Sequence, residues 1–232
     1  MDFEAVLFDL DGTLLTYDQD PADNVRDAFA RADVAQFCTT EELWAAAEAV
    51  GHAESDHEFL TRLFEIAAER HDGPTARAPS LATAYEAVVD HTQVSPRPGV
   101  EAALSAAQGV GKVGMVTNGE REKQRLKLDT LGITDHFETV VYAGEQTPPK
   151  PDPEPFHLAC GDLSVTPDRS LYVGNTLEAD VQGAKRAGLD VVWYPTERDQ
   201  GDPAGYDHQP NHTVETLATL ADLLTGEAVS SD

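Results

Sequence analysis

Basic residues are scarce in this chain. Of its 232 residues, 16 are Lys or Arg and 42 are Asp or Glu, which gives a formal net charge of −26. A surface this acidic repels the phosphates of nucleic acids and the headgroups of anionic membranes. We therefore expect neither nucleic acid nor membrane as a partner. Lysine is especially rare, and the five lysines are Lys112, Lys123, Lys127, Lys150 and Lys185.

The chain also lacks long apolar runs and has only two cysteines. No uncharged apolar stretch approaches the ~20 residues needed to cross a bilayer. The opening residues Met1-Asp2-Phe3-Glu4 lack the basic and apolar regions of a secretory signal. Cys38 and Cys160 lie far apart in unlike contexts, which favours two reduced thiols. We therefore expect a cytoplasmic protein, either a monomer or a homodimer.

The acidic residues are spread along the whole chain instead of forming one tail. This pattern resembles that of cytosolic proteins from salt-accumulating halophiles. At ~1 M salt the Debye length is about 3 Å, which screens the self-repulsion of such a surface. We expect a halophilic protein that needs salt.

Short apolar runs that end in polar groups predict buried parallel strands with functional groups at their carboxyl ends. The hydrophobic content of 41% is enough for a core of ordinary size. Such runs occupy residues 4–9, 112–117, 138–142, 170–174 and 190–194. Helices are expected between them, over residues 122–131, 153–160 and 177–187. This alternation predicts an α/β fold with a doubly wound parallel sheet.

Residues 19–92 break the alternation, because they contain no convincing strand. Asp20-Pro21, Thr39-x-x-Glu42 and Ser55-x-x-Glu58 each predict the start of a helix, and a fourth helix is expected over 81–91. We therefore expect a core made of residues 1–18 and 93–232, with a helical cap of residues 19–92 inserted after the first strand. Trp44 is expected in the buried core of this cap.

The segment Asp9-Leu10-Asp11-Gly12-Thr13 directly follows the first expected strand. Two carboxylates two residues apart can approach one site if the chain turns after the first, and Gly12 permits that turn. Calcium loops also contain Asp-x-Asp-Gly, but they need further oxygen ligands and a Glu near the twelfth position. Thr16-Tyr17-Asp18 does not fit that pattern, which argues against a calcium loop.

Polar groups follow three more of the expected strands. Thr117-Asn118 precedes a helix, where a hydroxyl and backbone N–H groups can hold a phosphate. Lys150 lies in Pro148-Pro149-Lys150-Pro151, a rigid segment that projects one cation. Asn175 and Asp180 offer oxygen ligands after residues 170–173. Taken singly, these features also fit an ordinary turn or a solvated surface lysine.

Together the four segments resemble the signatures of the haloacid-dehalogenase (HAD) superfamily, in the family's order and across about the whole chain. The resemblance implies a Rossmann-like core with a small alpha-helical cap of the C1 type. Residues 173–189 look most like the branch that contains phosphoglycolate phosphatases, sugar-phosphate phosphatases and nucleotidases. The resemblance thus implies a Mg²⁺-dependent phosphatase, a hydrolase of phosphomonoesters whose partner is a small phosphorylated metabolite.

The roles of the residues follow from the same resemblance. Asp9 corresponds to the nucleophile that becomes an aspartyl phosphate, and Asp11 to the general acid and base. Thr117, Asn118 and Lys150 correspond to the groups that hold the phosphoryl oxygens, and Lys150 also offsets the repulsion between the nucleophile and its substrate.

The metal position departs from the family pattern. The resemblance assigns Mg²⁺ to Asp9, to the backbone carbonyl of Asp11 and to Asn175, where the family usually has Asp. An amide oxygen can coordinate Mg²⁺, but the site loses one negative charge. Asp180 corresponds to a residue that holds a metal-bound water or orients Lys150, and a direct metal role for Asp180 stays open.

Three other functions are compatible with this fold. A 2-haloacid dehalogenase needs no acid for a leaving halide and typically lacks a carboxylate at the position of Asp11, so Asp11 favours phosphate chemistry. A phosphosugar mutase needs a cap that excludes water. A non-catalytic binding protein with a degraded metal site is the third alternative, with Asn175 as its sign.

Overall fold

The computed structural model describes residues 3–51, 53, 55–196 and 201–226. It consists of two units: a core unit of Met1–Thr16 and Ser95–Asp232, and an inserted unit of Tyr17–Val94. Both boundaries lie two residues from those expected from the sequence. The two passages of the chain between the units pair as short strands, β2 (Leu15–Tyr17) and β3 (Val94–Pro96).

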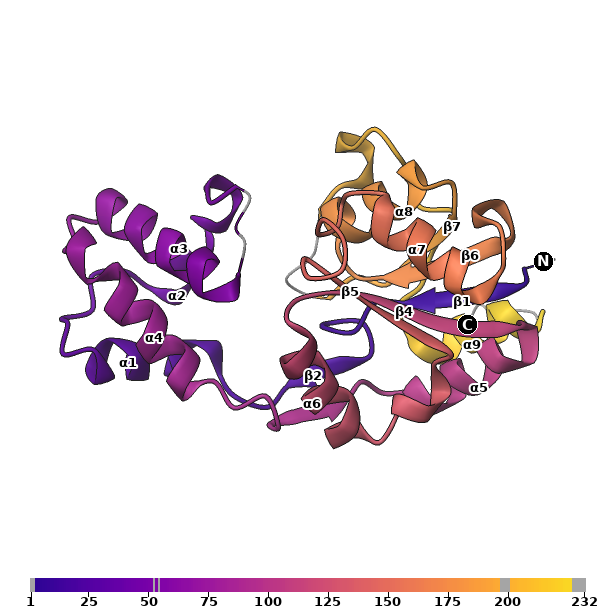
Figure 1. Cartoon of the computed structure of the whole chain (residues 1–232), viewed down its shortest axis with the longest axis horizontal. Coiled ribbons are helices and arrows are strands. Elements are labelled where there is room, and N and C mark those ends of the chain that lie inside the picture. The colour runs from indigo at the N-terminus through magenta and orange to yellow at the C-terminus, as the bar shows by residue number, and fades with distance from the viewer. Residues whose placement is uncertain (1–2, 52, 54, 197–200, 227–232) are drawn as a thin grey trace. The chain divides into compact units, whose positions relative to one another are not determined.

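The core unit contains a six-stranded sheet in the order β5-β4-β1-β6-β7-β8, and every neighbouring pair is parallel (Figure 1). The chain places β4 and β5 on one side of β1 and β6 to β8 on the other. This reversal of strand order confirms the predicted doubly wound α/β fold. The strands are β1 (Ala5–Phe8), β4 (Lys112–Asn118), β5 (Thr139–Ala143), β6 (Ser170–Gly174), β7 (Asp190–Trp193) and β8 (His212–Thr213). Of these, only β8 was not expected.

Helices cover both faces of this sheet (Figure 1). On one face α5 (Val100–Val110) packs against α9 (Leu217–Thr225) and against β1 and β4. On the other, α7 (Glu154–Leu163) packs against β1, β4 and β5. The remaining core helices are α6 (Arg121–Leu131) and the short α8 (Gly183–Arg186). No helix in the described ranges is long and apolar enough to cross a membrane.

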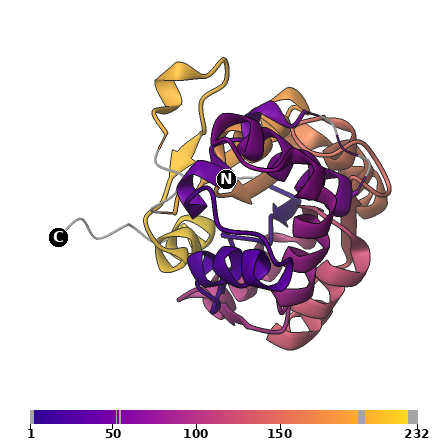
Figure 2. The same cartoon turned by 90° about the vertical axis from the view of Figure 1, so that its left-hand side faces the viewer.

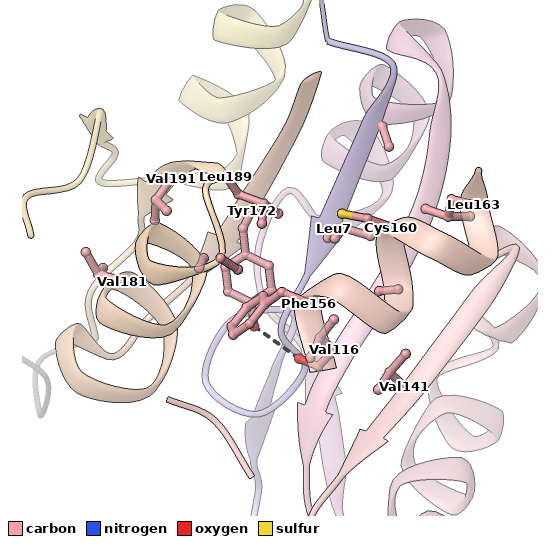
Figure 3. Close-up of a cluster of buried hydrophobic side chains, with 14 of the residues drawn as sticks. Leu7, Val116, Val141, Phe156, Cys160, Leu163, Tyr172, Val181, Leu189 and Val191 are labelled. Atoms are coloured by element: carbon pink, nitrogen blue, oxygen red, sulfur yellow. Dashed lines mark hydrogen bonds between the residues drawn. The ribbon is translucent and has the colours of Figure 1, made fainter. Parts of the chain in front are cut away.

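The core beneath α7 holds a cluster of fully buried side chains (Figure 3). Leu7 and Val116 from the sheet pack near Phe156 and Cys160 from α7, and Cys160 is buried. The rings of Phe156 and Tyr172 meet edge to face, with their centroids 4.9 Å apart. Such aromatic contacts add about 0.5–1.5 kcal/mol beyond the area they bury. This packing fixes the ring of Tyr172, whose hydroxyl reaches the carboxyl edge of the sheet.

The starts of α7 and of the following helix differ from the prediction. Asp152 accepts a hydrogen bond from Glu154 N (2.9 Å), and α7 begins at Glu154, one residue later than expected. The first backbone hydrogen bond of the helix runs from His157 N to Pro153 O, which makes Pro153 the N-cap. The expected helix over 177–187 starts as a π-helical turn, Leu177–Gln182, and becomes α-helical only in α8. π-Helical turns insert an extra residue into a helix and often occur near functional sites.

Between β2 and β3, the described residues of the inserted unit form helices joined by turns and loops (Figure 2). The caps predicted at Asp20, Thr39 and Ser55 are all present, and Thr39 forms the complete capping box with Glu42. The expected fourth helix starts and ends three residues early. The helices are α1 (Pro21–Arg31), α2 (Thr40–Trp44), α3 (Asp56–Arg70) and α4 (Ala78–Val88).

The prediction that Trp44 lies in the core of this unit was wrong. Leu43 is the fully buried residue of the five-residue helix α2, whereas 38% of Trp44 is exposed. Neighbouring residues of a helix point about 100° apart, so burial of Leu43 turns Trp44 outward. The indole ring makes an edge contact with Tyr85 at 6.2 Å between centroids.

Candidate active site

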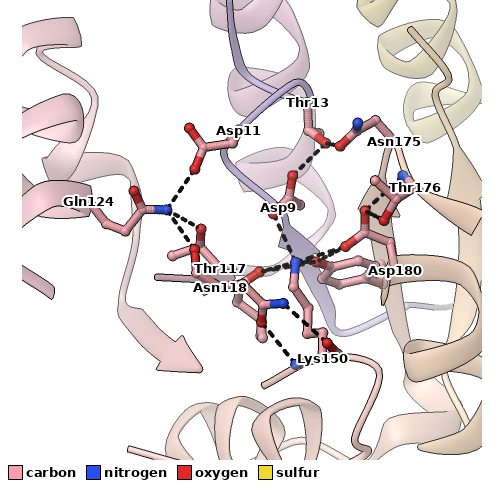
Figure 4. A network of polar contacts seen from close by, with 12 residues as sticks. Asp9, Asp11, Thr13, Thr117, Asn118, Gln124, Lys150, Asn175, Thr176 and Asp180 are labelled. Atoms are coloured by element: carbon pink, nitrogen blue, oxygen red, sulfur yellow. Dashed lines mark hydrogen bonds and ion pairs between the residues drawn. The ribbon is translucent and has the colours of Figure 1, made fainter. Parts of the chain in front are cut away.

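Four neighbouring strands bring the predicted site residues to one edge of the sheet (Figure 4). Asp9 follows β1, Thr117 and Asn118 end β4, and Lys150 lies in the loop after β5. Asn175 follows Gly174, the last residue of β6. Because these strands are parallel, their carboxyl ends meet at the point where the strand order reverses, which is where open α/β sheets bind ligands.

Asp9 is a buried carboxylate with both oxygens held. Lys150 Nζ lies 2.8 Å from Oδ1, and Thr13 Oγ1 lies 2.9 Å from Oδ2. Burial raises the pKa of Asp9 to about 7, and the attraction of Lys150 opposes this rise. The side chain is thus fixed in orientation and costly to ionise until a further positive charge approaches it.

Lys150 is surrounded by oxygen atoms. Its Nζ lies 2.8 Å from Asp9 Oδ1, 2.8 Å from Asp180 Oδ1, 2.9 Å from Tyr172 Oη and 3.1 Å from Val116 O. An ammonium group has three protons, so these four acceptors exceed what it can donate. Burial alone would lower the pKa of Lys150, but Asp180 and Asp9 outweigh burial and raise it above its usual value. Lys150 therefore stays cationic.

Asp180 is the second carboxylate beside Lys150. Its Oδ2 accepts hydrogen bonds from Thr176 N (2.9 Å) and Thr176 Oγ1 (2.8 Å), while Oδ1 faces Lys150 and Tyr172. Burial works against ionisation of Asp180, yet the contacts with Lys150 and Thr176 hold its pKa below its usual value. Of the two roles expected for Asp180, this geometry fits the orientation of Lys150.

Asn118 has a different contact from the one expected. Its Nδ2 donates to Lys150 O (3.1 Å), and its Oδ1 accepts from Lys150 N (2.9 Å). This reciprocal pair ties the end of β4 to the loop that carries Lys150. In this structure the Asn118 amide thus positions the Lys150 backbone, whereas the sequence predicted a contact with phosphoryl oxygens.

The oxygens near Asn175 fit a hard cation. Thr13 Oγ1 lies 2.9 Å from Asp9 Oδ2 and 3.1 Å from Asn175 Oδ1, but a hydroxyl has one proton and can donate to only one of them. The Asp9 carboxylate oxygen and the Asn175 amide oxygen thus lie within 3.1 Å of one hydroxyl, and both are oxygen ligands of the kind that Mg²⁺ accepts. Among the described residues no cluster of three His, Cys, Asp or Glu could hold a metal, so a site here needs the amide or a backbone carbonyl.

Gly12 is required for this arrangement. Its φ of +80° lies in the left-handed region, and a Cβ at this position would come within 2.8 Å of Asn175 Nδ2. Trp193 Nε1 donates to Asn175 O (2.7 Å) and fixes the backbone of Asn175 from the other side. The turn after β1 and the turn after β6 therefore contact each other through Gly12 and the side-chain amide of Asn175.

Sequence reasoning missed four residues of this site. Thr13 and Tyr172 contact Asp9 and Lys150, and Gln124 and Lys127 on α6 contact Asp11. Thr13 belongs to the Asp9-Leu10-Asp11-Gly12-Thr13 segment, although the sequence pattern predicts no role for it. Gln124 and Lys127 had a sequence signal, because they lie three residues apart on the helix that follows Thr117-Asn118. A lysine at this place is notable in a chain with few lysines.

Curated relatives and solved structures resemble this chain. It is 31% identical over 229 residues to the glyceraldehyde 3-phosphate phosphatase of Methanopyrus kandleri, covering 95% of this chain and 97% of that protein. It is 34% identical over 126 residues to the N-acylneuraminate-9-phosphatase of Rattus norvegicus, covering 54% of this chain and 50% of that protein. The chain therefore spans only about half of this second relative.

The fold has close counterparts as well. The magnesium-bound HAD-hydrolase YfnB of Bacillus subtilis superposes with a TM-score of 0.75 at 22% identity, covering 97% of this chain and 100% of that chain. A family model described as haloacid dehalogenase-like hydrolase matches residues 3–188. With the doubly wound sheet and the geometry at its carboxyl edge, this match shows that the chain belongs to the haloacid dehalogenase-like hydrolase family.

Proposed function

We propose that the protein hydrolyses phosphomonoesters of small metabolites through a phosphorylated intermediate on Asp9. The observation that carries this proposal is the placement of Asp9. Its carboxylate is buried at the switch point of the sheet, between the Lys150 ammonium and the Thr13 hydroxyl. The names of the curated relatives support the same reaction class, because both are phosphatases.

The proposed reaction has two steps. An Asp9 oxygen attacks phosphorus, the ester P–O bond breaks, and the leaving alkoxide takes a proton from Asp11. Water then attacks the phosphorus of the aspartyl phosphate and gives a proton to Asp11. The P–O bond to Asp9 breaks in this second step, which releases inorganic phosphate and restores the Asp9 carboxylate.

Charge balance explains why a cation belongs to the proposal. With Asp11 protonated for its role as the acid, the carboxylates of Asp9 and Asp180 are balanced by the ammonium groups of Lys127 and Lys150. A dianionic phosphate that enters this site is then left without a compensating positive charge. We propose that Asp9, the Asp11 carbonyl and Asn175 hold Mg²⁺, which when bound supplies positive charge beside the phosphoryl oxygens. Thr117 and Lys150 hold those oxygens in this proposal.

The helical inserted unit corresponds, in this proposal, to the cap of the family. Substrates to test are p-nitrophenyl phosphate as a generic aryl ester and a panel of small phosphorylated metabolites that includes glyceraldehyde 3-phosphate. The panel is assayed with Mg²⁺ at high salt by the release of inorganic phosphate. The proposal expects release that depends on Mg²⁺ and is lost in the presence of EDTA.

Asp9→Asn tests the intermediate. It keeps the shape of the side chain but removes the nucleophile, so turnover should fall by at least about 10⁴-fold while the circular dichroism spectrum is unchanged. Asp168→Asn makes the same change at an exposed carboxylate and should keep full activity. Beryllofluoride, which mimics the phosphoryl group, should bind on Asp9 in the wild type. Full turnover by Asp9→Asn would contradict the covalent mechanism.

The same protein preparation tests the alternatives. A dehalogenase would release chloride from 2-chloropropionate without Mg²⁺ and would not release phosphate. A mutase would convert one phosphosugar isomer to another with little free phosphate. A binding protein would bind phosphate esters without turning them over.

A further inference from the structure

Gln124 and Lys127 lie one turn apart on α6 and are both buried. Gln124 is 1% exposed and Lys127 is 4% exposed, whereas Leu126 between them is 44% exposed. A lysine is rarely buried to this extent unless a partner of opposite charge compensates it, because removing its charge from water is costly. The two side chains therefore turn toward the interior, where a polar partner is required.

That partner is Asp11. Lys127 Nζ lies 2.8 Å from Asp11 Oδ1 and 3.1 Å from Oδ2, so the ammonium contacts both carboxylate oxygens. Gln124 Nε2 lies 2.8 Å from Asp11 Oδ2, and Gln124 Oε1 accepts from Lys127 Nζ at 2.7 Å. The three side chains form a closed triangle of hydrogen bonds. The Asp11 carboxylate points toward α6, away from the carboxylate of Asp9 (Figure 4).

Gln124 also reaches the end of β4. Its Nε2 lies 2.6 Å from Thr117 Oγ1 and 3.1 Å from Asn118 O (Figure 4). In the first contact the threonine oxygen accepts, so the Thr117 hydroxyl proton is directed elsewhere. A hydroxyl that accepts from an amide on one side is set to donate on the other, as a ligand for a phosphoryl oxygen must. One glutamine thus contacts both Asp11 and Thr117.

We propose that Lys127 and Gln124 are positioning residues of the acid–base step: Lys127 fixes the carboxylate of Asp11, and Gln124 couples that carboxylate to the hydroxyl of Thr117. This inference rests on the proposed phosphatase activity and adds two residues of α6 to it. Neither side chain touches the reacting atoms in this scheme. Their effect passes through Asp11 and Thr117.

Lys127→Met tests the first half, because methionine keeps the length and apolar stem of lysine without its charge. A misplaced Asp11 should slow every step that needs proton transfer, by about 10–100-fold. p-Nitrophenolate leaves without protonation, so formation of the intermediate from p-nitrophenyl phosphate should stay within about threefold of wild type. Hydrolysis of the intermediate still needs Asp11, so rapid-mixing experiments should show a burst of p-nitrophenolate stoichiometric with enzyme.

An alkyl phosphate supplies the contrast. Its leaving group needs the proton of Asp11, so the first turnover itself should be slowed in Lys127→Met and no burst of alcohol should appear. Lys127→Arg keeps the charge and should recover part of the rate. If Lys127→Met does not fold, as judged by its thermal transition, Lys127→Gln removes the charge but keeps a hydrogen-bond donor and should show the same contrast.

Gln124→Met tests the second half. Losing the contact with Thr117 should weaken inhibition by inorganic phosphate by about tenfold, which corresponds to about 1.4 kcal/mol, the size expected for one well-placed hydrogen bond. Lys127→Met should change this inhibition much less. Equal effects of the two variants on phosphate inhibition would overturn the separate roles given to the two residues.

Arg125→Met is the matched control. It removes a cation from the exposed side of the same helix and should leave both phases of the reaction unchanged. This inference would be overturned if the wild type is active and Lys127→Met loses the same fraction of its rate with aryl and with alkyl esters. That result would leave the proposed function intact. A wild type without phosphatase activity would overturn both.

Discussion

Asp9 stands in an unusual balance of burial and charge. Desolvation disfavours the ionised form of Asp9 and raises its pKa. Lys150 alone does not restore the usual pKa, because its ammonium group is shared between Asp9 and Asp180. The negative charge of Asp180 also disfavours a second negative charge on Asp9. A proton and a metal ion therefore compete for the same carboxylate. The competition makes the metal affinity of this site depend on pH in a predictable direction.

Mg²⁺ binding should weaken as the pH falls below about 7. The metal-free pKa of Asp9 is raised to about 7, so above that pH the carboxylate is ionised and the affinity is at its plateau. Below it, each pH unit should lower the apparent affinity about tenfold, because the fraction of ionised Asp9 falls tenfold. Calorimetric titrations between pH 5 and 9 at fixed salt measure this without any turnover. An affinity that is constant over this range would show that Asp9 is not a ligand.

Asn175 gives the second prediction for a single residue. If its amide oxygen binds Mg²⁺, Asn175→Asp should tighten Mg²⁺ binding, because the added negative charge attracts the divalent ion. Repulsion between the new carboxylate and Asp9 offsets part of this gain. Asn175→Ala should weaken binding and raise the Mg²⁺ concentration needed for half-maximal activity. Asp180→Ala serves as the comparison, because its effect should appear through Lys150, in the rate and not in the metal affinity. An unchanged metal dependence of Asn175→Ala would exclude this residue as a ligand.

Among the elements, the turn that follows β6 has little room for change. Gly174 ends the strand, and a Cβ at this position would lie 2.5 Å from both Cβ and Cγ of Asp180. Asp180 cannot easily move, because its two oxygens are held by Lys150, Tyr172 and Thr176. The π-helical turn of Leu177–Gln182 carries Asp180 back against the end of its own strand.

Gly174→Ala should therefore destabilise the protein by about 1–3 kcal/mol, the range for overpacking a filled interior. Gly161→Ala is the control: Gly161 lies in α7, and a Cβ there meets no described atom within 4 Å. This control should be neutral or stabilising by up to about 1 kcal/mol, because alanine loses less backbone entropy than glycine in a helix. Denaturant unfolding of both variants measures the difference. A Gly174→Ala variant as stable as the wild type would mean that the turn can open at little cost.

At the scale of the whole molecule, charge dominates. A formal net charge of −26 on a chain of 25.0 kDa destabilises the compact state through self-repulsion. The ion pairs at the surface offset little of this, since exposed pairs contribute about 0–1 kcal/mol each. Screening by salt is the remaining way to reduce the repulsion.

The thermal midpoint should rise steeply between ~0.1 M and ~1 M KCl and more slowly above that, because the Debye length falls from about 10 Å to about 3 Å over the first interval. Sucrose at equal osmolality is the control, since it stabilises by exclusion without screening charge. A midpoint that is flat or falling over the low-salt interval would mean that the acidity has another role.

The sequence by itself determined the strands, their polar ends and most helix starts. A strand buried on both faces must be apolar along its length, so residues 4–9 and 112–117 could be recognised locally, and Asp9 and Thr117 with them. Caps such as Thr39 are equally local, because the hydrogen bonds that define them span three residues. The start of α7 was missed by one residue, because a helix boundary depends on which backbone carbonyl accepts the first hydrogen bond, and the π-helical turn was not predicted.

Only the tertiary structure decided the contacts within the site. Lys150 and Asp9 are 141 residues apart, and Lys127 and Asp11 are 116 apart. Whether such side chains meet depends on the order of strands in the sheet and on which face of α6 is turned inward, and no local pattern encodes either. The same holds for Asn118, whose amide takes the Lys150 backbone as its partner, and for Trp44, whose exposure was set by the burial of its neighbour Leu43. Residue types follow from local chemistry, whereas hydrogen-bond partners follow from packing between segments that are distant in the chain.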